Sequence, residues 1–91
     1  MKPAELRAWL ADRGLLEPVV TAARDHHATL DEVFSRERTP RVAVARWAVW
    51  TALVDAGSSH VEIGRLWGVD HTTVRHGCTS LPRRTVGEAA E

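Results

Sequence analysis

The sequence contains little cysteine and no long apolar stretch. One cysteine, Cys78, occurs among 91 residues, which excludes a disulfide within the chain and indicates either a reducing compartment or indifference to the redox state. No apolar run approaches the roughly 20 residues that a membrane-spanning helix requires, and the first residues lack the apolar core of a signal peptide. We therefore expect a cytoplasmic protein that has no membrane partner.

Spacings typical of metal and catalytic sites are also missing. His26 and His27 are adjacent, His71 and His76 are five residues apart, and neither C-x-x-C nor H-x-x-x-H occurs. No nucleophile–base pair or pair of carboxylates suggests a catalytic set, and the phosphate-binding pattern G-x-x-x-x-G-K-[ST] is absent. We expect no metal site, no cofactor, no nucleotide partner and no enzymatic activity.

The chain has no excess of charge of either sign. Its 12 basic and 12 acidic residues give a net charge of zero, whereas a nucleic-acid-binding domain is usually basic. The distribution is uneven, however. Residues 1–35 contain four basic and six acidic residues, residues 36–46 contain four arginines and one glutamate, and residues 65–84 contain four arginines and one aspartate. Two basic segments therefore remain for local contacts with phosphate groups, although long-range steering would be weak.

Apolar spacing and capping signals predict an all-α domain of five to six short helices. Thr29 and Ser59 each precede a glutamate by three residues, the capping-box pattern that marks a helix start. Thr39 suits an N-cap, and Pro40 suits the first helical position after it. Pro82 is expected to stop the last helix. The predicted helices cover residues 3–13, 18–27, 30–34, 40–56, 60–67 and 71–80.

The apolar faces of these helices supply the expected core. The helix over 40–56 is almost entirely apolar after Arg46, so we expect it to be central and buried. We expect the four tryptophans to pack in the interior, because a base-stacking platform needs exposed rings beside a basic groove. The inward residues are predicted to be Leu6, Trp9, Leu10, Val19, Val20, Ala23, Leu30, Val33, Phe34, Val42, Ala45, Trp47, Val49, Trp50, Ala52, Leu53, Val54, Ala56, Val61, Ile63, Leu66, Trp67, Val74, Cys78 and Leu81.

The stretch from Gly68 to His76 is typical of the second half of a helix-turn-helix motif. Gly68 permits the positive φ that a tight turn between helices often needs, and Asp70 suits the N-cap of the next helix. Short polar side chains and a cation follow, as they do on a recognition helix that enters the major groove of DNA. The outward residues of this helix are predicted to be His71, Thr72, Arg75, His76 and Thr79.

A family resemblance rests on this motif. The sequence D-H-T-T-V at residues 70–74, preceded by E-I-G-R-L-W-G at residues 62–68, resembles the C-terminal DNA-binding domain of DnaA, the bacterial chromosomal replication initiator. Residues 28–34 are similar to a short helix of that family, and residues 36–46 are similar to its basic loop and the start of its long helix. The resemblance covers roughly residues 18–81 and implies a helix-turn-helix domain that binds double-stranded DNA.

The resemblance also implies roles for individual residues. His71, Thr72 and Thr73 match positions that read bases in the major groove, where a threonine can contact a thymine methyl group. Arg38 matches an arginine that enters the adjacent minor groove, since a narrow A·T-rich groove attracts guanidinium groups. Arg46 matches a second arginine that supports these contacts. The full set of predicted DNA-binding residues is Arg36, Arg38, Arg41, Arg46, Asp70, His71, Thr72, Thr73, Arg75 and His76.

Two of these residues have further expected roles. Asp70 fits either a base contact or the helix cap, and both roles remain open. His76 matches a histidine of the family's recognition helix that is expected to contact a phosphate.

The chain departs from the family pattern near the motif. Val69 alone stands where the family has a glycine and an arginine, Glu37 interrupts the basic loop, and Thr79 and Ser80 replace basic residues. Each change removes a contact to the DNA backbone and so weakens the salt-dependent part of binding. These departures leave a second interpretation open, a protein–protein adaptor that keeps the fold without DNA affinity.

The expected organisation has three parts. Residues 1–17 form an extra helix packed on the domain, residues 18–84 form the DnaA-like domain, and residues 85–91 form a frayed tail. The family's ATP-binding motor has no counterpart in this sequence. We therefore expect a stand-alone regulator of replication or transcription, encoded for example by a phage or mobile element. The extra helix is expected to cap the core, with a homodimer interface as the alternative.

Overall fold

The computed structural model of the chain describes residues 2–80, and these residues form helices and no strand. The predicted all-α fold is therefore confirmed. Predictions for Leu81, Pro82, Arg83, Arg84 and the tail over 85–91 lie outside the described residues. The helices are α1 (Pro3–Asp12), α2 (Leu16–Asp25), α3 (Leu30–Phe34), α4 (Pro40–Asp55), α5 (His60–Trp67) and α6 (His71–Ser80).

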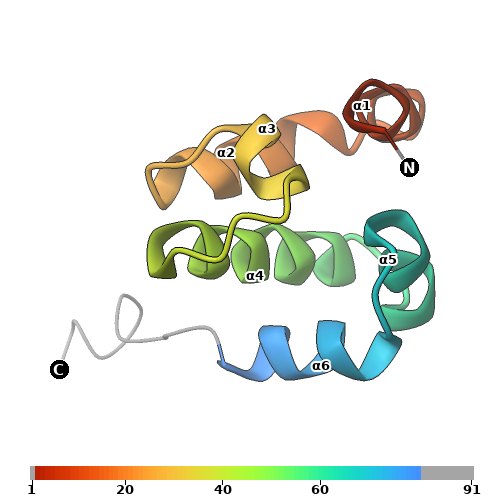
Figure 1. The fold of residues 1–91 in the computed structure, drawn as a ribbon. Coiled ribbons are helices and arrows are strands. Elements are labelled where there is room, and N and C mark those ends of the chain that lie inside the picture. The colour runs from red at the N-terminus through yellow and green to blue at the C-terminus, as the bar shows by residue number, and fades with distance from the viewer. Residues whose placement is uncertain (1, 81–91) are drawn as a thin grey trace, which may run out of the picture.

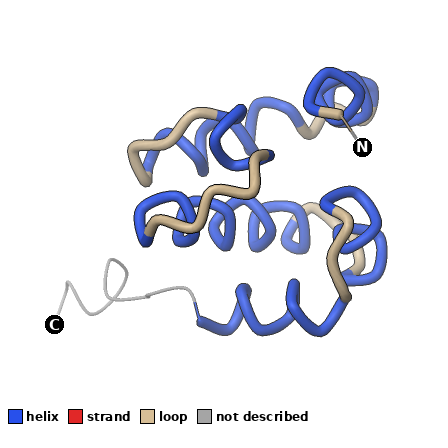
Figure 2. The backbone as a smooth tube through the Cα atoms, in the orientation of Figure 1, coloured by secondary structure: helices blue, strands red, loops and turns tan. Residues whose placement is uncertain are grey.

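The long helix α4 runs through the middle of the molecule (Figure 1). α2 and α3 pack on one side of it, α6 packs on the other, and α5 packs against α6. Figure 2 shows that the loop over residues 35–39 passes alongside α4 between the end of α3 and the start of α4. The prediction of a central, buried helix is confirmed, since Val42, Ala45, Val49 and Leu53 of α4 are at most 1% exposed.

The boundaries of α2 differ from the prediction. The helix begins at Leu16, so Pro18 occupies its third position and not its first. Proline is tolerated there because amide groups of the first turn have no partner within the helix. The helix ends at Asp25, two residues earlier than predicted, and His27 adopts a left-handed conformation with φ of 61°.

Three predicted caps have three different outcomes. Thr29 and Glu32 form the full capping box, with Thr29 Oγ1 accepting from the Glu32 amide and Glu32 Oε1 accepting from the Thr29 amide. Ser59 Oγ accepts from the Glu62 amide at 3.0 Å, which is one half of such a box. Thr39 makes no side-chain cap, and Pro40, whose fixed φ suits the first helical position, follows it directly.

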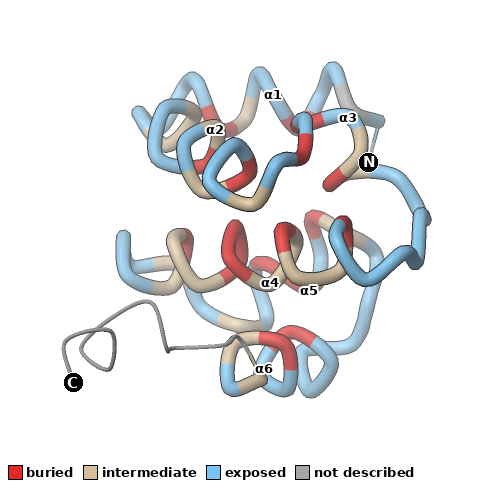
Figure 3. Tube along the Cα trace, turned by 90° about the vertical axis from the view of Figure 1, so that its left-hand side faces the viewer, coloured by how far each residue is buried: buried red, intermediate tan, exposed pale blue. Residues whose placement is uncertain are grey.

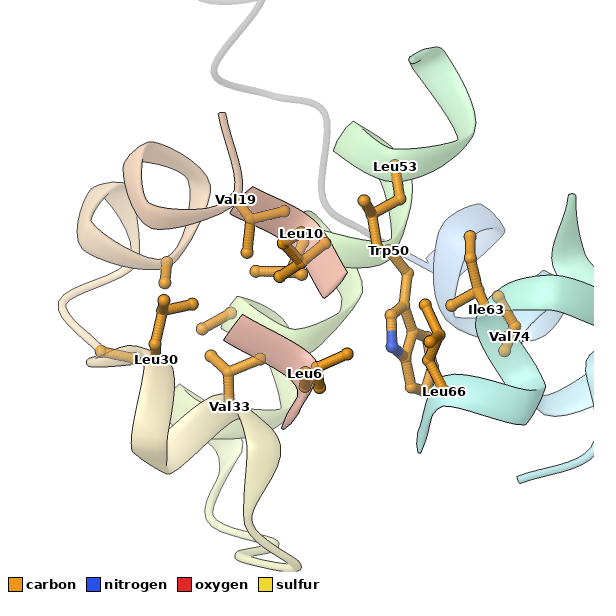
Figure 4. Close-up of a cluster of buried hydrophobic side chains, with 14 residues drawn as sticks. Leu6, Leu10, Val19, Leu30, Val33, Trp50, Leu53, Ile63, Leu66 and Val74 are labelled. Atoms are coloured by element: carbon orange, nitrogen blue, oxygen red, sulfur yellow. The ribbon is translucent and has the colours of Figure 1, made fainter. Parts of the chain in front are cut away.

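Trp50 of α4 joins the two halves of the core. In Figure 4 its indole lies between a group of side chains from α1 to α3 and a group from α5 and α6. The exposed fraction of Trp50 is 3%. Figure 3 shows the buried residues of the helices facing one another around α4. Burial of Leu6 and Leu10 at 2% and 0% exposure shows that α1 covers part of this core.

Some predicted core residues are not buried. Val61 is 47% exposed, because it lies two positions, about 200° around the helix, from the buried Ile63. Ala56 is exposed because α4 has already ended at Asp55. The residues that are only half-buried are Trp9, Val20, Phe34, Trp47, Ala52, Val54, Trp67 and Cys78. No helix within residues 2–80 has both the length and the apolar character that crossing a bilayer would demand.

Candidate nucleic-acid interface

The turn between α5 and α6 depends on two glycines. Gly68 has φ of 73°, a left-handed conformation that ends α5, and the next amide, of Val69, donates to the Gly64 carbonyl at 2.8 Å. Gly64 is buried in α5, and a Cβ atom built on it would lie 2.6 Å from the Val69 carbonyl oxygen. The two helices can therefore approach at this angle only because position 64 carries no side chain.

Asp70 caps the start of α6, as its sequence position suggested. Its Oδ1 accepts from the Thr72 amide at 3.1 Å, and this bond is the main cause that lowers the pKa of the Asp70 carboxyl. The same oxygen lies 3.1 Å from Nδ1 of His71. The carboxylate thus caps the first turn and lies beside one of the predicted base-reading side chains.

The residues of α6 separate into a buried side and an exposed side. Val74 and Gly77 are buried, whereas the predicted DNA-binding residues of the helix point outward. Near the end of α6, His76 Nε2 lies 3.3 Å from the Ser80 hydroxyl. The exposed side chains on α6 are those of His71, Thr72, Thr73, Arg75, His76 and Thr79.

Arg41 has partners inside the protein. Its Nη1 donates to the His27 carbonyl at 2.6 Å, and its Nη1 and Nη2 donate to the two Glu32 oxygens at 3.0 and 2.8 Å. This paired hydrogen bond is the main cause that lowers the pKa of the Glu32 carboxyl from 4.5 to about 2 and raises the pKa of Arg41. Arg41 therefore fastens the start of α4 to α3 and to the left-handed residue that ends the α2 segment.

Arg46 holds the loop over residues 35–39 in place. Its Nε donates to the Val33 carbonyl at 2.9 Å, and its Nη2 donates to the carbonyls of Ser35 and Glu37 at 2.8 and 3.0 Å. Burial, together with the nearby positive charge of Arg38, lowers the pKa of Arg46. One partly buried guanidinium thus satisfies three backbone carbonyls and fixes the course of the loop.

Arg36 and Arg38 extend from this fixed loop. Both are exposed, and within residues 2–80 neither forms a hydrogen bond or an ion pair. They line a groove of about 660 Å³, whose walls also include Val69 of the turn before α6 and Thr73 in the first turn of α6. We call this feature the loop–α6 groove. The structure thus brings the unpaired loop arginines and the start of α6 to one surface, whereas Arg41 and Arg46 serve the fold.

Two residues that position the elements around this groove were not predicted from the sequence. Trp67 donates from Nε1 to the Val33 carbonyl at 3.1 Å, the same oxygen that Arg46 binds. Gly77 lets α6 approach α4, because a Cβ built on it would lie 2.5 Å from Cδ1 of Trp47. The indole nitrogen and the mid-helix glycine were visible in the sequence, but their partners lie on other helices and no local pattern indicates them.

The described residues contain no group of three His, Cys, Asp or Glu side chains that could hold a metal ion. No protein-family model matches the chain, and no solved structure resembles it at a significant level. The resemblance to the initiator domain therefore rests on sequence motifs alone, and a function must be argued from the geometry of the surface itself.

Proposed function

We propose that the chain binds double-stranded DNA in a sequence-specific manner, as a helix-turn-helix regulator of replication or transcription. The observation that carries this proposal is the shared surface of α6 and the loop arginines. Arg38 and Thr73 line the same groove from different elements. In B-DNA the major and minor grooves are separated by one sugar-phosphate backbone, so neighbouring protein elements can enter both.

In this arrangement α6 enters the major groove with its N-terminal end. His71 and Thr72 are exposed there and offer an imidazole, a hydroxyl and a methyl group to base edges. Asp70 acts as the cap of α6, so a direct base contact is not needed to explain its presence. Arg38 reaches the neighbouring minor groove, and Arg36 and Arg75 are available for phosphate contacts.

The loop over residues 35–39 is already ordered in the free protein, which favours this function. A guanidinium that enters a minor groove must be presented at a fixed place relative to α6, and ordering a mobile backbone costs about 1–2 kcal/mol per residue. Arg46 already binds the carbonyls of Ser35 and Glu37 in the free protein. Arg41 and Arg46 therefore contribute to binding indirectly in this proposal, by positioning the two exposed arginines.

A salt titration with random and A·T-rich duplexes tests the proposal. About three to five phosphate contacts predict log–log slopes between about −3 and −4.5. Thr72→Ala should reduce discrimination at one base pair by about 1–3 kcal/mol, whereas Thr21→Ala, an exposed threonine on α2, should change nothing. Absence of binding at low salt, or an unchanged base preference in Thr72→Ala, would contradict the proposal.

The second candidate is a protein–protein adaptor without DNA affinity. Its support is the zero net charge and the internal use of Arg41 and Arg46, which leaves few cations for phosphate groups. A flat salt response in the same titration would favour it. A homodimer through α1 remains a prediction; of the apolar residues it would use, Leu6 and Leu10 are already buried within the domain, whereas Trp9 is half-buried.

A further inference from the structure

The loop–α6 groove combines free positive charge with aromatic rings. Arg36 and Arg38 are exposed at its edge, and Phe34, Trp47 and Trp67 line it while remaining half-buried. Its volume of about 660 Å³ lies within the range of about 300–1,000 Å³ that is typical of ligand pockets. Partly exposed rings beside a basic groove can serve as a base-stacking platform, and the sequence alone did not indicate this arrangement.

The rings are held rigidly. Phe34 and Trp67 meet edge to face, with centroids 5.5 Å apart, and Trp50 meets Trp67 with centroids 6.1 Å apart. Trp67 is fixed further by its hydrogen bond to the Val33 carbonyl. A flat ligand that contacts this cluster would lose little binding free energy to side-chain ordering, because the side chains are ordered already.

We propose that the loop–α6 groove binds single-stranded DNA, with bases against the aromatic rings and phosphate groups on Arg36 and Arg38. Every base has a π face, so stacking on a ring tolerates any sequence. The bases of a closed duplex are stacked on one another and cannot meet these rings. Thr73 of α6 also lines the groove, and the choice of DNA over RNA rests on the function proposed above for this helix.

Stacking of bases in the groove does not itself require that α6 reads a duplex. Thr72, the residue chosen to test base reading, does not line the groove, whereas Arg36 and Phe34 do. The two activities can therefore fail separately. If both occur, a single strand and a duplex should compete for Arg38.

Tryptophan fluorescence with an oligothymidylate tests the groove directly, because three of the four tryptophans line it. We expect saturable quenching, with a log–log salt slope of about −1.4 for two phosphate contacts to a single strand. Removing both exposed arginines in Arg36→Ala/Arg38→Ala should weaken binding at least tenfold and flatten the slope. Arg24→Ala removes an exposed arginine on α2 and should leave binding unchanged.

A second variant separates stacking from charge. Phe34→Ala should weaken binding and leave the salt slope unchanged, with circular dichroism used to confirm that the variant is folded. No quenching at low salt, or equal affinities for the wild type and the double arginine variant, would overturn the proposal. Tighter binding of oligouridylate would also overturn it, by assigning the groove to RNA. Oligothymidylate binding without any duplex binding would support the groove and refute the duplex function.

Discussion

Gly64→Ala is the substitution that most directly tests how α5 and α6 are joined. In an isolated helix the change would stabilise α5 by about 1 kcal/mol, because alanine has the higher helix propensity. In this structure the new Cβ would lie 2.6 Å from the Val69 carbonyl oxygen and 3.3 Å from the His71 amide nitrogen. Both are backbone atoms, so the conflict cannot be relieved by rotating a side chain.

The magnitude follows from two opposing effects. Overpacking of a close contact typically costs about 1–3 kcal/mol, and a weakened bond from the Val69 amide to the Gly64 carbonyl would cost about 1 kcal/mol more. Against the gain in propensity, a net loss of about 1–3 kcal/mol is expected. For a domain of this size, that corresponds to a fall in Tm of at least about 4 °C.

The assay is thermal and urea unfolding followed by circular dichroism, with duplex binding measured in parallel. Gly68→Ala is an informative comparison, because its Cβ would meet nothing within 4 Å, while its φ of 73° is costly for alanine. It should lose about 1–2 kcal/mol through backbone strain alone. A Gly64→Ala variant that is more stable than the wild type would refute the close approach of α5 to the turn.

Further predictions concern α4 and its partners. Gly77→Ala should lose about 1–2 kcal/mol in urea unfolding, since a Cβ at 2.5 Å from Trp47 outweighs the gain in helix propensity; unchanged stability would contradict this contact. Arg46→Lys keeps the charge, but its donors sit on a single nitrogen and cannot span the carbonyls that Nε and Nη2 bind separately, so trypsin should cleave the loop over 35–39 faster than in the wild type. Because the pKa of Glu32 is lowered to about 2 in the folded protein, its contribution to stability is complete above about pH 4.5 and is lost as the pH falls toward 2. Thermal unfolding between about pH 2 and pH 7 should show this loss, and Glu32→Gln should show a smaller one.

Local signals in the sequence predicted the helices well. The Thr29–Glu32 pair marked the start of α3, Gly68 marked the end of α5, and both depend only on residues close in the chain. The same locality explains the errors. Val61 was predicted to face inward with the other apolar residues of α5, but packing against α4 and α6 buries the side that carries Ile63 and Leu66 and leaves Val61 47% exposed.

The candidate site was harder to predict from the sequence than the helices were. Four arginines between residues 36 and 46 form one basic segment in the sequence, and nothing local distinguishes them. The structure separates them by their partners. Glu32 is nine residues from Arg41, and the three carbonyls bound by Arg46 lie on another helix and its following loop. Such pairings depend on how α3 and α4 pack, which no spacing rule supplies.

Because only some of the arginines are paired inside the protein, the net charge alone does not predict how the chain binds nucleic acid. A zero total would suggest weak attraction to nucleic acid, and internal pairing of Arg41 and Arg46 lowers the available positive charge further. The same pairing, however, fixes the loop that carries Arg36 and Arg38, so these two side chains need little backbone ordering when they bind. Because few cations are free, we expect the salt-dependent, non-specific affinity for DNA to be low. The specific affinity should suffer less, because it depends on where the cations are placed and not on the total charge. The expected signature is a shallow salt slope together with a preserved preference among duplexes.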